Sequence, residues 1–138
     1  MTITGTYCPR GSSAQLNCPD GFVGRRARLE RIAECEPCAA GYACPAGART
    51  PTACAPSTFA TNLSKSCQVC AAGTFQSLST QSRCEVCSRG HFCPVASAVP
   101  SGCPAGTHSN RTRLTGSSQC EASPAGYFSE AASSEATR

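Results

Sequence analysis

Cysteine constrains this chain more than any other residue type, because 13 of its 138 residues are cysteines. Such a content in a short chain is typical of a scaffold held together by disulfides. Large apolar side chains are few, with one Met, no Trp, five Phe and three Tyr. They cannot bury enough surface to offset the conformational entropy lost on folding, so cross-links must stabilise the fold.

The cysteines follow a repeat in which glycine and an aromatic residue recur behind them. Glycine stands three residues after a cysteine at five places: Gly21, Gly41, Gly73, Gly90 and Gly106. An aromatic ring follows within two residues at most of them and is expected to pack on the neighbouring disulfide. The predicted fold is small and disulfide-rich: an extended rod of short modules, with short two-stranded β ribbons, turns and little regular secondary structure.

The repeat divides the chain into four parts. They are a partial first repeat (1–37), a second repeat with an extra module at 70–84 (38–86), a third repeat (87–122) and a cysteine-less continuation (123–138). No segment is apolar enough to span a membrane, and the first residues do not resemble a signal peptide. Because disulfides imply secretion, we expect this chain to be a segment of a longer precursor.

Four of the cysteines have the spacing of a zinc site. Cys67, Cys70, Cys84 and Cys87 form two C-x-x-C pairs separated by thirteen residues, close to the pattern of a zinc ribbon. However, Cys67 and Cys87 have equivalents in parts of the repeat that lack this spacer, and nine further cysteines would remain as thiols. We therefore expect disulfides and no metal or other cofactor, with a zinc protein as the alternative.

Two N-glycosylation sequons occur at similar places in the repeat. Asn62-Leu63-Ser64 begins eight residues after Cys54, and Asn110-Arg111-Thr112 begins seven residues after the equivalent Cys103. A sequon is used only in the secretory pathway and on an exposed loop. Asn62 and Asn110 are therefore the predicted glycosylation sites of an extracellular or cell-surface glycoprotein.

The C-x-x-G modules with C-x-x-C joints resemble the ephrin-receptor-like cysteine-rich repeat, and they are also similar to the cysteine-rich modules of tumour-necrosis-factor receptors. The resemblance spans nearly the whole chain and implies one local bridge followed by two interleaved ones. The implied bridges are Cys8–Cys35, Cys38–Cys54, Cys44–Cys67, Cys70–Cys84, Cys87–Cys103 and Cys93–Cys120. Cys18 is left unpaired or bonded to another chain, because its implied partner position is Thr2. Ser123 and Thr137 similarly replace the two ends of a further bridge.

No catalytic constellation is recognisable, and we expect no enzyme activity. The C-x-x-C pairs lack the helix that a redox-active thiolate requires, and His91 and His108 belong to no nucleophile motif. A net charge of +4 without a broad basic face and stacking aromatics argues against nucleic-acid binding.

Two functions remain. The first is a structural module of a secreted or cell-surface glycoprotein, a building block or spacer of an extracellular fibre, stalk or coat. Its partners would be further copies or neighbouring chains of the assembly, with covalent glycans on the exterior. The alternative is a ligand-binding ectodomain segment of a cell-surface receptor. Its contacts would be the Cys18–Cys35 and Cys103–Cys120 loops, with anchors at Arg25, Arg26, Arg28, Arg111 and Arg113.

Overall fold

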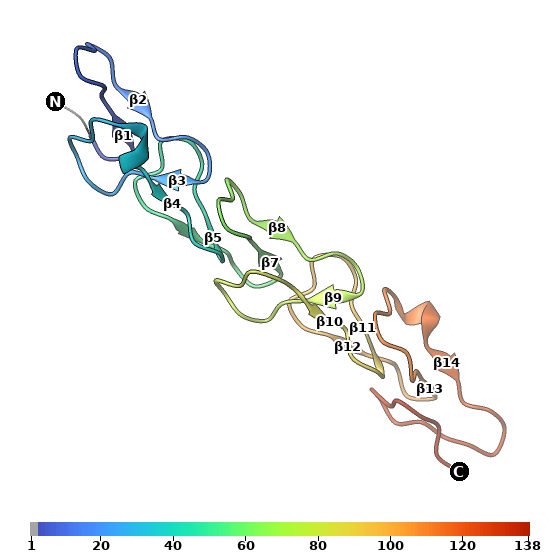
Figure 1. Ribbon diagram of the computed structural model, residues 1–138. Coiled ribbons are helices and arrows are strands. Elements are labelled where there is room, and N and C mark those ends of the chain that lie inside the picture. Colours follow the sequence, from blue (N-terminus) through green and yellow to red (C-terminus); the bar gives the residue numbers. More distant parts are fainter. Residues whose placement is uncertain (1–2) are drawn as a thin grey trace. The chain divides into compact units, whose positions relative to one another are not determined.

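A computed structural model describes residues 3–138 of the chain (Figure 1). Its regular structure consists of seven two-stranded β ribbons and two short 3₁₀ turns. The ribbons are β1 (Thr6–Tyr7) with β2 (Leu16–Asn17), β3 (Phe22–Val23) with β4 (Glu36–Pro37), β5 (Tyr42–Ala43) with β6 (Thr52–Ala53), β7 (Thr58–Phe59) with β8 (Gln68–Val69), β9 (Thr74–Phe75) with β10 (Glu85–Val86), β11 (His91–Phe92) with β12 (Ser101–Gly102), and β13 (Thr107–His108) with β14 (Glu121–Ala122). The 3₁₀ turns are η1 (Ile32–Glu34) and η2 (Ser117–Gln119). The predicted disulfide-rich fold with little regular structure is confirmed.

Five of the seven ribbons are built by the same local sequence, in which a glycine stands three residues after a cysteine and the first strand follows. The segment Cys38-Ala39-Ala40-Gly41 makes a tight turn, in which the N–H of Tyr42 donates to the carbonyl of Ala39 (3.2 Å). Gly41 has φ +88°, a left-handed conformation that side-chain-bearing residues adopt at a cost. The aromatic strand β5 follows at once, and its partner strand β6 ends directly before the next ribbon's first cysteine, Cys54.

The chain forms two compact units. Unit 1 contains the described residues up to Ala55 together with Phe59–Gln68 and Ser79–Ser82, and unit 2 contains Pro56–Thr58, Val69–Leu78 and Arg83–Arg138. Within each unit the ribbons follow one another in sequence order, as the colours of Figure 1 show.

Backbone hydrogen bonds join each ribbon to the next. In unit 1 the N–H of Gly21 donates to the carbonyl of Cys44 (2.8 Å), and the N–H of Cys44 donates to Ser64 (2.8 Å). A third bond runs from the later ribbon to the earlier one: the N–H of Leu63 donates to the carbonyl of Cys38 (3.0 Å). The same three bonds recur in unit 2, with Gly90, Cys93 and Arg113 as donors. Because these contacts use backbone groups, they depend little on side-chain identity.

Half-cystines make up most of the buried core. Beside them the largest buried apolar side chains are Val23, Leu29 and Leu114, so no extended apolar core forms among the described residues. Tyr7 and Phe22 pack against the cluster of Cys18, Leu29 and Cys35, as expected for rings next to a disulfide. No helix in the described part of the chain is long and apolar enough to cross a membrane.

Candidate functional site: the disulfide ladder and its two breaks

Six disulfides form a ladder in which every bridge closes within one ribbon. Short bridges span six residues, and long bridges span 13 to 17 residues. The short bridges are Cys38–Cys44 and Cys87–Cys93. The long bridges are Cys18–Cys35, Cys54–Cys67, Cys70–Cys84 and Cys103–Cys120. No disulfide links one ribbon to another among the described residues.

This pairing corrects the interleaved pattern that the resemblance implied. Of the six implied bridges only Cys70–Cys84 is also present in the structure. The other five are wrong: Cys8–Cys35, Cys38–Cys54, Cys44–Cys67, Cys87–Cys103 and Cys93–Cys120. The turn at Gly41 reverses the chain and brings Cys38 to a Cα–Cα distance of 6.0 Å from Cys44, within the reach of a disulfide. Cys54 lies beyond β6 and opens the next ribbon instead.

The unpaired cysteine is Cys8, whereas the sequence had indicated Cys18. Cys18 is fully buried in its bridge to Cys35. Cys8 corresponds to the second cysteine of a short bridge. Its partner would stand six residues earlier, at position 2, where the sequence has Thr2 instead of a cysteine. Thr2 lies outside the described residues. The Cys8 sulfur is half-buried and lies 3.5 Å from the carbonyl oxygens of Ser12 and Ala14.

The second break has a different form, because serines occupy both ends of a short-bridge position. Ser123 and Ser129 are six residues apart, like Cys38 and Cys44, and their hydroxyl oxygens lie 2.6 Å apart in a hydrogen bond. Ser129 is buried. The prediction that Ser123 and Thr137 replace one bridge is therefore wrong: Thr137 instead exchanges two backbone hydrogen bonds with Phe128 (2.7 and 2.8 Å).

The ladder divides the four cysteines of the zinc-like spacing among three bridges. Cys67 pairs with Cys54, Cys70 with Cys84, and Cys87 with Cys93. Their sulfurs cannot serve as thiolate ligands in this state. Within residues 3–138 no group of three His, Cys, Asp or Glu side chains is placed to hold a metal ion.

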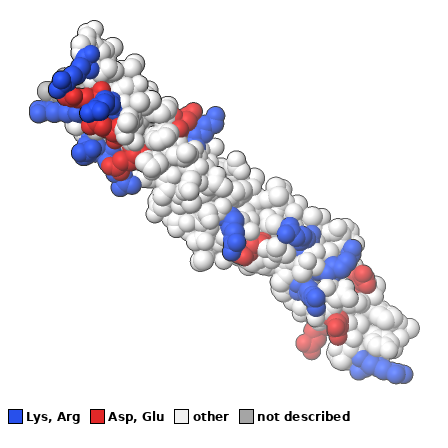
Figure 2. All heavy atoms as spheres, viewed as in Figure 1, with Lys and Arg blue, Asp and Glu red and all other residues white. Residues whose placement is uncertain are grey.

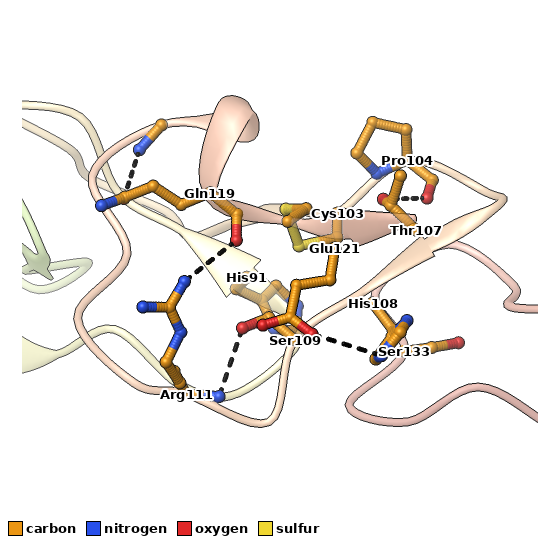
Figure 3. The surroundings of a disulfide bond; sticks show 12 residues. His91, Cys103, Pro104, Thr107, His108, Ser109, Arg111, Gln119, Glu121 and Ser133 are labelled. Atoms are coloured by element: carbon orange, nitrogen blue, oxygen red, sulfur yellow. Dashed lines mark hydrogen bonds and ion pairs between the residues drawn. A yellow bond between two sulfur atoms is a disulfide. The ribbon is translucent and has the colours of Figure 1, made fainter. Parts of the chain in front are cut away.

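The Cys103–Cys120 ribbon shows how a long bridge is supported (Figure 3). Gln119, at the end of η2, accepts hydrogen bonds at its Oε1 from the backbone N–H groups of Thr115 (2.6 Å) and Gly116 (3.3 Å). Its carbonyl accepts from Nη2 of Arg111 (3.3 Å). These contacts close the loop that contains the buried Leu114.

The Cys18–Cys35 ribbon repeats this arrangement with a carboxylate in place of the amide. Oε1 of Glu34 accepts from the backbone N–H groups of Glu30 and Arg31, both at 2.9 Å, above the buried Leu29. The bond from Glu30, followed by that from Arg31, holds the pKa of Glu34 below its ordinary value. Sequence reasoning missed this capped loop. Its signal was the pattern Arg-x-Arg-Leu-x₄-Glu/Gln-Cys, present at 26–35 and again at 111–120.

The five arginines proposed as receptor anchors are all exposed. Arg28 and Arg113 occupy equivalent loop positions, each with φ +63°. They belong to different units, as do the two groups of anchors around them. Near the chain's start the arginines alternate with carboxylates: Arg10 pairs with Glu30 (3.2 Å), and Figure 2 shows blue and red side chains intermixed there. This surface is not a uniformly basic patch.

The two histidines lie on strands and take part in the ribbons. His91 on β11 has its Nδ1 3.0 Å from the carbonyl oxygen of Arg89. His108 on β13 faces Glu121 across the ribbon, with 4.0 Å between Nε2 and Oε2 (Figure 3). Its Nδ1 is buried and has no hydrogen-bond partner among the described residues. His108 thus occupies the strand position that carries an aromatic ring in several other ribbons.

Both sequon asparagines lie on exposed loops outside the strands. Asn62 borders an open, largely apolar depression, which Pro37, Cys38, Ala39 and Leu63 also line. Both asparagines are thus exposed, as a glycosylation site requires.

Comparison with known proteins supplies no relative from which a function could be transferred. No protein-family model and no curated protein matches the chain. Function must accordingly be argued from the ladder, its two breaks and the exposed loops.

Proposed function

We propose that this chain is a non-enzymatic structural module of a secreted or cell-surface glycoprotein, a spacer or building block of an extracellular fibre, stalk or coat. The central support is the ladder: six of the seven ribbons each contain a disulfide of their own, and successive ribbons are hydrogen-bonded through the backbone. Such a chain can be lengthened by repetition without any specialised core.

The chemistry of the ladder supports an oxidising compartment. Six disulfides in a chain of 138 residues are characteristic of proteins outside the cytosol. The exposed Asn62 and Asn110 sequons fit the same compartment. Together these features favour an extracellular or cell-surface glycoprotein, the location that the resemblance to ephrin-receptor-like repeats also implies.

A receptor ectodomain is the second candidate, and one observation favours it. The capped loops of the Cys18–Cys35 and Cys103–Cys120 ribbons hold Arg28 and Arg113 in matching, exposed conformations. Preorganised arginines are frequent anchors of protein interfaces. A soluble protein ligand would then be needed to engage them.

Localisation of the native protein tests the proposal. An antibody against this segment should label intact, unpermeabilised cells or their extracellular structures. Removal of N-glycans should lower the apparent mass of the wild-type protein, and Asn62→Gln with Asn110→Gln should abolish that shift. A protein found reduced in the cytosol would contradict the proposal. Labelling restricted to a receptor complex with a soluble ligand would favour the second candidate.

A further inference from the structure

The loop that carries the first sequon is held in place by its backbone. The N–H of Leu63 donates to the carbonyl of Cys38 (3.0 Å), and the carbonyl of Ser64 accepts from the N–H of Cys44 (2.8 Å). Both bonds reach the preceding ribbon, so the sequon is anchored at its second and third residues. The side chain of Asn62 therefore starts from a defined point on the surface.

Leu63 differs from the residues that hold the same position in other loops. At this position the backbone N–H donates to the carbonyl of a cysteine in an earlier ribbon, as Leu63 does to Cys38. The other residues that donate in this way are Gly47, Thr80, Ala96, Arg113 and Ala132. Within residues 3–138, Leu63 is thus the one large apolar residue at this position, and it is 50% exposed. The backbone contact itself does not require a leucine.

The depression beside Leu63 is apolar except for the asparagine. It is lined by Pro37, Cys38, Ala39, Asn62 and Leu63, all in unit 1, and has a volume of about 400 Å³. Proteins hold small ligands in hollows of roughly 300 to 1,000 Å³. Because Asn62 is the polar member of this lining, a group attached to its side-chain nitrogen begins directly beside an apolar surface.

The first sugar of an N-glycan has the chemistry that fits this surface. N-acetylglucosamine is bonded to the side-chain nitrogen of asparagine and carries an acetyl methyl group and ring C–H groups. Removing these groups and Leu63 from water is favourable. The hydroxyl groups of the sugar stay on the open side of the depression, in contact with water, so docking leaves none of them buried without a hydrogen-bond partner.

We propose that the N-acetylglucosamine attached to Asn62 lies in this depression, against Leu63 and Ala39, and stabilises the loop. This inference rests on the proposed function, because the sugar is added in the secretory pathway. It also gives the two sequons different roles. Asn62 directly precedes Leu63, whereas Asn110 stands three residues before Arg113, the equivalent residue, which is charged. The sugar on Asn110 is therefore expected to extend into solvent.

NMR of the full chain with one N-acetylglucosamine on each sequon tests the docking. The chain is secreted with its glycans, which an endo-β-N-acetylglucosaminidase then trims to a single sugar. A nuclear Overhauser effect should connect the acetyl methyl of the Asn62 sugar with the methyl of Ala39, which belongs to the preceding ribbon. Hydrogen exchange of the Leu63 amide should be severalfold slower than in the chain without sugars, because docking opposes opening of the loop. Exchange of the Arg113 amide should not change.

Leu63→Arg is the matched control. It keeps a sequon of the form Asn-Arg-Ser, like Asn110-Arg111-Thr112. Arg113 shows that the backbone position accepts arginine, since its φ is +63° and that of Leu63 is +62°. The variant should retain six disulfides and the Asn62 sugar by mass. It should lose both the contact with Ala39 and the slower exchange at position 63, judged against the same variant without sugars.

Several results would overturn the inference. They are a sugar on Asn62 without contact to Ala39, equal slowing of exchange at Leu63 and Arg113, docking that persists in Leu63→Arg, and an Asn62 that carries no sugar in the secreted chain. Any of these, with the native protein still found outside the cytosol, would leave the proposed structural function standing. A native protein found reduced in the cytosol would instead remove the proposed function itself.

Discussion

At the scale of single residues, Cys8 is the position where the ladder lacks a partner. Its sulfur is half-buried but unbridged, whereas Cys18 is fully buried in a disulfide. Only a free thiol reacts with an alkylating reagent. We expect iodoacetamide to add one group per chain under non-reducing conditions, with peptide mapping placing it on Cys8. An adduct on Cys18 would contradict the observed pairing.

Glu34 should make the stability of its loop depend on pH. Its pKa is depressed mainly by the N–H of Glu30, so its contribution to stability is present above the pKa of the unfolded chain. The contribution is lost as the pH falls through the lower, folded-state pKa. We expect the amide resonance of Arg31, measured by NMR, to shift on acidification at a pH below the ordinary pKa of a glutamate side chain.

Gln119 is the natural control for this titration. It caps η2 through an amide that does not ionise, so the amide resonance of Gly116 should stay constant over the same range. In the Glu34→Gln variant the shift at Arg31 should disappear while the loop remains folded. Equal acid shifts at Arg31 and Gly116 would show that another group titrates.

At the scale of the ribbon, turn glycines should differ in their tolerance of a side chain. In Gly41→Ala the new Cβ would clash with the backbone carbonyl oxygen of Thr80. In Gly126→Ala the new Cβ meets no atom within 4 Å. Both variants carry the strain of a positive φ, roughly 1 kcal/mol. The clash should raise the total cost of Gly41→Ala to roughly 3 kcal/mol. Urea unfolding of the oxidised protein at low concentration measures the loss of stability in both variants. Equal losses would show that the Thr80 carbonyl does not restrict the turn at Gly41.

The serine pair should accept a disulfide. Ser123 and Ser129 hold the positions of a short bridge, with their oxygens 2.6 Å apart. The double variant Ser123→Cys/Ser129→Cys should oxidise spontaneously, losing two hydrogens in mass, and gain about 2 kcal/mol of stability. Each single variant should show an additional free thiol and no such gain. A double variant that stays reduced under air would contradict the equivalence with Cys38–Cys44.

The ribbons themselves were predictable because their signals are local. The segment from Cys38 to Tyr42 contains the turn glycine and the ring that begins the strand, and the structure forms the expected ribbon there. Partner choice was not predictable in the same way. Cys44 lies six residues after Cys38, and Cys54 lies sixteen residues after it. The spacing alone does not show which of the two is the disulfide partner of Cys38. The decision depends on how sharply Gly41 turns the chain.

At the scale of the whole molecule, the sequence also contains a repeat that is longer than one ribbon. The capped loops at 26–35 and 111–120 are 85 residues apart, and so are Cys8 and Cys93, and Cys44 and Ser129. This register would have placed Ser129, rather than Thr137, opposite Ser123. It would also have placed Cys8, rather than Cys18, opposite the vacant position at Thr2. Alignment of the closely spaced cysteines did not reveal the 85-residue repeat, because long and short bridges do not alternate regularly along the chain.

The central claim for the whole molecule is that every cross-link is local to one ribbon. A non-reducing peptide map of the native protein tests it most directly, with cleavage between Cys44 and Cys54, for example after Arg49. The ladder predicts that Cys38 and Cys44 appear in one internally bridged peptide, separate from the peptide that contains Cys54–Cys67. Fragments joined across the cleavage site through Cys38–Cys54 or Cys44–Cys67 would contradict the ladder and restore the interleaved arrangement.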